Sequence, residues 1–137
     1  MSAETETLAE ASSKLVLVVE DDPGQLELTK YILGREGFRL SNCGDGRVGV
    51  DAVRRSSPDL VVLDLMLPGL GGYEFIKELQ AAGCGDVPIV VLTARILDPK
   101  LIEMFRLESN VRGFHQKPAT PALGRTLHSV LGTRRPA

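Results

Sequence analysis

Short apolar runs recur along the chain and predict buried β-strands. Three of them, at residues 15–19, 60–63 and 89–92, are rich in β-branched residues and too short to form helices. Two further segments, residues 38–41 and 111–115, alternate apolar with polar or small side chains, as strands at the edges of a sheet do. The pattern therefore predicts three strands that are buried on both faces and two edge strands.

Segments with helical spacing separate these strands. Apolar side chains recur three or four positions apart within them: Leu26, Ile32 and Leu33, then Phe75, Ile76 and Leu79, then Leu123, Leu127 and Val130. Asp22 and Asp98 each precede a proline, a pair typical of a capped helix start. Gly37 predicts the end of the first helix, and Asn110 predicts a left-handed residue after the fourth. Only its place between two strands favours a helix over residues 46–55, because Gly49 lowers the helix propensity.

Alternating strands and helices predict an α/β fold. We expect a flavodoxin-like (βα)5 doubly wound parallel sheet with strand order 2-1-3-4-5 and helices on both faces. Residues 14–131 form this predicted domain. The acidic segment 1–13 is expected to be a flexible N-terminal tail, and residues 132–137 a C-terminal tail.

Composition narrows the class of protein. The chain has 137 residues, of which 43% are hydrophobic and 25% charged, and this fits one globular domain without a membrane span. A net charge of −2 argues against direct nucleic-acid binding, which needs clustered basic residues. Without an export signal, Cys43 and Cys84 are expected to be reduced thiols in a cytoplasmic protein.

Polar side chains follow the predicted strands at the edge of the sheet where such folds bind ligands. They are Glu20, Asp21 and Asp22 after the first strand, Asp64 after the third, Thr93 after the fourth and Lys117 after the fifth. Crowded carboxylates favour a neutralising hard cation, and Mg²⁺ suits Asp21 and Asp64. Asp64 could then act as a nucleophile in phosphoryl transfer, with Thr93 and Lys117 donating to the phosphoryl oxygens.

Four motifs at these strand ends resemble those of response regulator receiver domains of two-component signalling: Val-Glu-Asp-Asp-Pro at 19–23, Asp-Leu-Met-Leu-Pro-Gly at 64–69, Leu-Thr-Ala at 92–94 and Lys-Pro at 117–118. The resemblance covers residues 14–131. It implies that Asp64 is the phosphoacceptor and that Thr93 and Lys117 contact the phosphate. Asp21 and the Met66 carbonyl would be direct metal ligands, and Glu20 would act on the metal through water. Phe114 would be the switch residue.

The same resemblance implies further features. The Lys117–Pro118 bond is expected to be cis, and the side chains of Met66 and Arg95 to flank the phosphoryl group. The chain departs from the family between Thr93 and Lys117, an interval slightly longer than usual, and at residues 109–111, where relatives often carry a Gly-Ala pair. This departure bears on the fourth helix and leaves the acceptor site intact.

The function implied is that of a phosphoprotein in a phosphorelay. A histidine kinase or a histidine phosphotransfer protein would donate the phosphoryl group, and the output would be binding to a downstream protein partner, with a homodimer as one form of it. No contact with nucleic acid or membrane is expected. The chain would not be an enzyme apart from assisting its own phosphorylation and dephosphorylation.

The same residues leave two alternatives open. A pseudo-receiver would bind a partner without phosphorylation, which the intact Asp21, Asp64, Thr93 and Lys117 disfavour. A Mg²⁺-dependent phosphohydrolase would need a second acid at the position of Met66.

Other side chains carry simpler expectations. Phe114 could equally serve packing, and His115 and His128 are expected to be surface groups. Five apolar residues crowd the fourth helix, too many for one buried stripe, which predicts an exposed partner surface there: Leu101, Ile102, Met104, Phe105 and Leu107.

Overall fold

The computed structural model describes residues 8–94 and 98–136. Its main sheet has five parallel strands in the order β3-β2-β4-β5-β6. They are β2 (Leu15–Val19), β3 (Arg39–Cys43), β4 (Leu60–Leu63), β5 (Ile89–Thr93) and β6 (Val111–Gln116). Counted among themselves, these strands have the predicted order 2-1-3-4-5, so the flavodoxin-like fold is confirmed.

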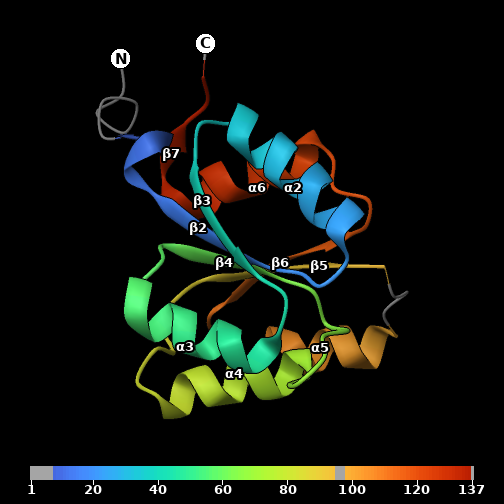
Figure 1. Ribbon diagram of the computed structural model, residues 1–137. Coiled ribbons are helices and arrows are strands. Elements are labelled where there is room, and N and C mark those ends of the chain that lie inside the picture. The colour runs from blue at the N-terminus through green and yellow to red at the C-terminus, as the bar shows by residue number, and fades with distance from the viewer. Residues whose placement is uncertain (1–7, 95–97, 137) are drawn as a thin grey trace.

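Helices cover both faces of this sheet (Figure 1). On one face lie α2 (Pro23–Arg35) and α6 (Pro121–Leu131), and on the other lie α3 (Gly46–Ser56), α4 (Gly72–Ala81) and α5 (Pro99–Arg106). Side chains of the central strands alternate between two apolar clusters. Val16 and Val18 of β2 pack toward the α2 and α6 side, whereas Leu17 and Val19 pack toward the other helices.

The predicted helix boundaries depend on local caps. Asp22 accepts a hydrogen bond from the Gln25 amide at 2.9 Å, and Asp98 accepts one from the Lys100 amide at 2.7 Å. Gly37 follows the end of α2 with a φ of +95°, a conformation that favours glycine. Both predicted starts and the predicted first stop are therefore confirmed.

Helix α3 contains Gly49 for a packing reason. A Cβ added at Gly49 would lie 2.9 Å from the Phe75 ring of α4, so only glycine permits this close approach of the two helices. The residue that lowers helix propensity in the sequence is thus required by the contact, and the helix predicted at residues 46–55 is confirmed.

The expectation for Asn110 is wrong. Among the described residues other than glycine, only Ser57 has a positive φ. Asn110 lies at the entry to β6, where its carbonyl accepts from the Ile89 amide at 2.7 Å and its buried carboxamide donates to the Val87 carbonyl at 3.2 Å. Pairing with β5, rather than helix termination, determines its conformation.

The described parts of both expected tails are structured. Strand β1 (Ala9–Glu10) pairs in parallel with β7 (Thr133–Arg134), and a 3-10 turn, η1 (Ala11–Ser13), leads from β1 into the main sheet. Residues 9–13 and 133–134 therefore form secondary structure within the segments that were expected to be tails. No helix in the described part of the chain is long and apolar enough to span a membrane.

The expectation for His128 is also wrong. Its ring is buried, with Nε2 2.9 Å from Glu36 Oε1 and Nδ1 2.7 Å from Thr133 Oγ1. His128 would face solvent if α6 were not covered on this side. Thr133 of β7 and Glu36, directly after α2, cover it. His115 is half-buried rather than a free surface group, with Nε2 2.8 Å from Thr126 Oγ1, and burial lowers its pKa.

Candidate functional site

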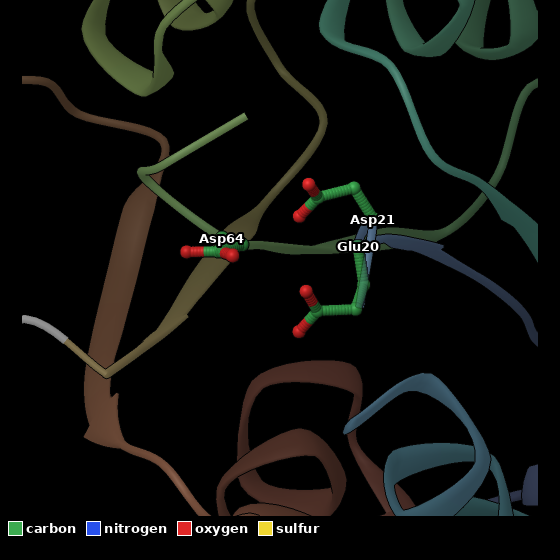
Figure 2. Close-up of side chains that lie close together, drawn as sticks. All are labelled: Glu20, Asp21 and Asp64. Atoms are coloured by element: carbon green, nitrogen blue, oxygen red, sulfur yellow. The ribbon is translucent and has the colours of Figure 1, made fainter. Parts of the chain in front are cut away.

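Three carboxylates meet at the carboxyl edge of the sheet. Glu20 and Asp21 follow β2, and Asp64 follows the neighbouring strand β4, so parallel pairing brings them together. One oxygen from each lies within 4.8 Å of the others. Figure 2 shows the carboxylates of Glu20 and Asp21 directed toward the side where Asp64 lies. Glu20 and Asp64 are buried, whereas Asp21 is exposed, so the cluster opens to solvent through Asp21.

Lys117 supplies the positive charge of the site. It follows β6, and its Nζ lies 3.0 Å from Asp64 Oδ2 and forms a second ion pair with Glu20. Burial alone would lower the pKa of the Lys117 ammonium, but hydrogen bonds and charge attraction from Glu20 and Asp64 outweigh it and raise that pKa. The ammonium is therefore held in its charged form between two buried carboxylates.

Glu20 has both carboxylate oxygens engaged. Oε1 pairs with Lys117, and Oε2 accepts from the Asp22 amide at 3.2 Å. Burial raises the pKa of the Glu20 carboxyl, against the opposing effects of Lys117 and the Asp22 amide. Both oxygens of Glu20 therefore have partners within the folded chain, one a side-chain cation and the other a backbone amide.

Asp64 is held on both sides by the local backbone. Its own amide donates to the Val19 carbonyl at 3.1 Å, and its Oδ1 accepts from the Met66 amide at 3.1 Å. These contacts fix the carboxylate at the start of the loop between β4 and α4. The Met66 side chain is 59% exposed beside it.

Thr93 ends β5 next to the exit of β6. Its side chain is buried, and its carbonyl accepts from the Lys117 amide at 2.8 Å. The backbone thus brings the hydroxyl and ammonium residues predicted for this site to neighbouring strand ends. The Lys117–Pro118 peptide bond is cis, as the resemblance implied. Arg95, expected to flank the site, lies outside the described residues.

Phe114 belongs to an aromatic group behind this edge. Its half-buried ring meets Phe105 edge-on with centroids 6.2 Å apart, and the Arg106 guanidinium lies 5.3 Å from the centroid of the Phe114 ring. Phe114 therefore has the packing role that was one of its two expected roles. Its switching role stays a prediction.

The donor set suits a hard divalent cation. All of its clustered side-chain ligands are carboxylates, and no histidine or cysteine belongs to the cluster formed by the described residues. Mg²⁺ prefers oxygen ligands and commonly takes one or two carboxylates with several waters. The exposed Asp21 leaves one side of the cluster open to solvent.

Two features of the site were missed from sequence. The direct pairing of Glu20 with Lys117 had no local signal, because the two residues meet only in the folded sheet. The turn before α3 also lies against this edge, with Gly44 beside Asp21 and Asp45 beside Gly69. In the sequence, Asp45 carries only the signal of a helix cap.

Comparison with known proteins agrees with this geometry. Residues 16–127 match the model of the response regulator receiver domain. The DNA-binding response regulator MtrA of Mycolicibacterium smegmatis is 42% identical over 106 residues, which are 77% of this chain and 45% of that protein. The probable transcriptional regulatory protein TcrX of Mycobacterium tuberculosis is 38% identical over 87 residues, which are 64% of this chain and 37% of that protein. The chain spans less than half the length of either relative.

Solved structures resemble this chain over most of its length. The receiver domain of a sensor histidine kinase from Pseudomonas aeruginosa, with a magnesium ion coordinated in its active-site cleft, superimposes with a TM-score of 0.75 at 30% identity, covering 88% of this chain and 98% of that one. The chemotaxis protein CheY4 of Vibrio cholerae gives 0.76 at 26% identity, covering 90% and 100%. With a family model matched over most of its length, this chain belongs to the response regulator receiver domains of two-component signalling.

Proposed function

We propose that Asp64 accepts a phosphoryl group from a phosphohistidine on a histidine kinase or histidine phosphotransfer protein. The observation that carries the proposal is the pairing of Lys117 with the buried carboxylates of Asp64 and Glu20, beside the exposed Asp21. This arrangement joins a carboxylate nucleophile, a fixed positive charge and an acidic opening for a cation at one strand edge.

Mg²⁺ is the proposed cofactor. Asp21, Asp64 and the Met66 carbonyl would hold it directly, and Glu20 would act through water. The magnesium ion described for the Pseudomonas aeruginosa receiver domain supports this assignment. When bound, the ion offsets the repulsion between the acidic site and the incoming phosphoryl group.

The transfer exchanges one bond to phosphorus for another. An oxygen of Asp64 forms a bond to phosphorus while the bond from phosphorus to the histidine nitrogen breaks, and the nitrogen keeps the electron pair. Lys117 and Thr93 donate to the phosphoryl oxygens. In the later hydrolysis, a water oxygen forms a bond to phosphorus while the bond from phosphorus to the Asp64 oxygen breaks, so that Asp64 is regenerated as a carboxylate and inorganic phosphate is released.

The proposed output is a change at α5 and β6. Thr93, drawn toward the phosphoryl group, would shift the chain that follows it and allow Phe114 to turn inward. Phosphorylation would then favour one of two existing arrangements, and a downstream protein partner or a second copy of the chain would bind it. The pseudo-receiver alternative is disfavoured because the four residues needed for phosphorylation occupy the expected strand ends.

Phosphorylation by acetyl phosphate with and without Mg²⁺ tests the proposal. The wild type should take up phosphate only with the cation, and Asp64→Asn should take up none while remaining folded, because it keeps the shape of the nucleophile without its chemistry. Asp22→Asn is the matched control, since Asn also caps helices and Asp22 has no assigned role in the transfer. A wild type that stays unmodified would favour the pseudo-receiver.

A further inference from the structure

The turn between β3 and α3, residues 44–46, contacts both chain segments that carry the clustered carboxylates. On one side it meets the segment that carries Glu20 and Asp21. The Cys43 carbonyl just before the turn accepts from the Glu20 amide at 2.9 Å, and a Cβ added at Gly44 would lie 3.7 Å from the Asp21 Cα.

On its other side the turn meets the loop that follows Asp64. The Gly46 amide donates to the Pro68 carbonyl at 3.2 Å, and a Cβ added at Gly46 would overlap the Leu70 carbonyl. The two chain segments therefore approach as closely as backbone allows, and glycine is required at this contact.

Asp45 stands at the centre of this contact. One of its oxygens accepts from the Arg47 amide at 2.7 Å and the Val48 amide at 3.3 Å, which fixes the carboxylate at the start of α3. The fixed carboxylate lies against Gly69, where an added Cβ would overlap both of its oxygens, and Gly69 has a φ of +81°. The cap of α3 is thus also a support for the loop between β4 and α4.

We infer that Asp45 is a positioning residue for the metal site, acting through Gly69 on the loop that carries Met66. The inference rests on the proposed function, because a cation held by Asp21 and by that loop needs the two segments at a fixed separation. Asp45 lies on a third segment, the β3–α3 turn, and from there it holds the Asp21 segment and the loop after Asp64 at a fixed distance from each other. It does this without touching the cation. Outer residues of this kind change metal affinity by holding the ligands in place.

Mg²⁺ titration of the metal-free protein by calorimetry tests the inference. Asp45→Ala should raise the Kd for Mg²⁺ about tenfold, at the lower end of the range for outer residues. Asp45→Asn keeps the cap and the shape of the side chain, so its Kd should stay close to that of the wild type. In the absence of Mg²⁺, amide hydrogen exchange over residues 65–70 should be faster in Asp45→Ala and unchanged in Asp45→Asn.

Asp59→Ala is the matched control. Asp59 also accepts a backbone hydrogen bond, from the Leu15 amide at 2.8 Å, but at the opposite edge of the sheet. Its loss should cost stability and leave the Mg²⁺ Kd unchanged. Equal affinities of wild type and Asp45→Ala would overturn the inference, as would an Asp45→Asn variant as weak as Asp45→Ala, which would mean that charge alone acts.

Gly69→Ala gives a second route that does not depend on the helix cap. The added methyl group must push against the Asp45 carboxylate, so this variant should also weaken Mg²⁺ binding. Adding Asp45→Ala should then cost less than it does in the wild type, because the contact is already broken. If the effects of Gly69→Ala and Asp45→Ala on the Kd are strictly additive in the double variant, Asp45 does not act through Gly69. If Asp45→Ala alone folds poorly, an unchanged Kd in Gly69→Ala would contradict the inference.

Mg²⁺ binding by the wild type and the effect of Asp45 on it are tested by separate outcomes. A wild type that binds no Mg²⁺ refutes the proposed function, and the exchange of residues 65–70 in the metal-free variants still decides whether Asp45 holds this loop. A wild type that binds Mg²⁺ with the same Kd as Asp45→Ala refutes only the positioning role.

Discussion

Lys117 is the residue on which the metal-free site depends most. Its ammonium is the charge that compensates the buried carboxylates of Glu20 and Asp64. Removing one partner of a buried ion pair leaves charge uncompensated, so Lys117→Met should lower the free energy of unfolding by about 3 kcal/mol. Because Mg²⁺ can replace part of the lost charge, it should stabilise the variant more than the wild type. Urea unfolding with and without Mg²⁺ measures both effects.

An exposed ion pair provides the control for this prediction. Arg55 pairs with Asp51 at 3.0 Å, with side chains 70% and 59% exposed, and such pairs contribute little to stability. Arg55→Met should therefore have a far smaller effect and no dependence on Mg²⁺. Equal losses in the two variants would show that Lys117 is not specifically needed to compensate the acids.

Asp21 and Asp22 are neighbours with different expected roles. Asp21→Ala should raise the Kd for Mg²⁺ by about tenfold or more and increase metal-free stability, because it relieves repulsion among the acids. Asp22→Ala should instead lower stability by about 1 kcal/mol through loss of its cap on the Gln25 amide, with little change in Kd. Titration and urea unfolding of both variants separate the roles, and an unchanged Kd in Asp21→Ala would exclude it as a ligand.

At the residue scale, a site residue can be predicted from the sequence when a reactive side chain directly follows a recognisable strand. Asp64, Thr93 and Lys117 each follow an apolar strand, so the parallel sheet alone brings them to one edge. Asp22 was likewise identified as a cap by the proline after it. The burial of His128 could not be predicted, because the residues that cover it, Glu36 and Thr133, lie on separate elements.

At the scale of elements, α5 carries the exposed apolar surface expected for the fourth helix. Phe105 is buried, whereas Met104 is 37% exposed and Leu107, which directly follows α5, is 81% exposed, so one buried stripe does not hold all the apolar residues of this region. We predict that stable phosphorylation, or an acyl-phosphate mimic, changes amide hydrogen exchange between residues 94 and 115. Identical exchange in the two states would contradict the switching model and leave Asp64 as the acceptor.

The same helix offers a test of output. Met104→Ser with Leu107→Ser should weaken self-association or partner binding of the phosphorylated protein, because it removes exposed apolar area without disturbing the buried Phe105. Tyr31 is 61% exposed on α2, so Tyr31→Ser is a matched control on the opposite side of the sheet. Sedimentation of the phosphorylated variants measures self-association, and equal weakening by both changes would argue against a specific α5 surface.

Elements were predictable where burial alone defines them. The fully apolar strands β2 and β4 have the predicted bounds, residues 15–19 and 60–63. The edge strand β3 begins at Arg39 rather than Phe38 and extends to Cys43, since pairing with β2 sets its register. The prediction for Asn110 is wrong for a similar reason, because its contacts come from Ile89 at the start of β5 and from Val87 just before that strand.

At the scale of the whole molecule, the two ends of the described chain are joined. Strand β1 pairs with β7, and Glu36, His128 and Thr133 form a buried polar network beneath them. His128→Leu leaves Glu36 and Thr133 buried without this partner, so the free energy of unfolding should fall by about 2–4 kcal/mol. Amide exchange at Ala9, whose amide donates to the Gly132 carbonyl at 2.9 Å, should become faster.

His115→Leu is the comparison for this network. His115 is half-buried and has one hydrogen-bond partner, Thr126, so its replacement should cost less and leave exchange at Ala9 unchanged. A His128→Leu variant as stable as the wild type would mean that the polar network does not hold the ends of the chain together.

This joining of the ends could not be foreseen from local pattern. Strand β1 has two residues, and its partner lies more than a hundred positions away, so neither strand shows the alternation that identifies edge strands. The acidic composition of the first residues instead favoured a tail. The main sheet was predictable because its strands are long enough for their apolar or alternating sequence pattern to be recognised.

The central claim is that this receiver domain is phosphorylated on Asp64 with the help of Mg²⁺. Intact-mass measurement after incubation with acetyl phosphate and Mg²⁺, followed by mapping of the modified residue, tests it most directly. We expect the mass of one added phosphoryl group, located on Asp64 and absent when Mg²⁺ is removed. An unmodified protein, or a phosphoryl group found at the native rate on another residue, would contradict it.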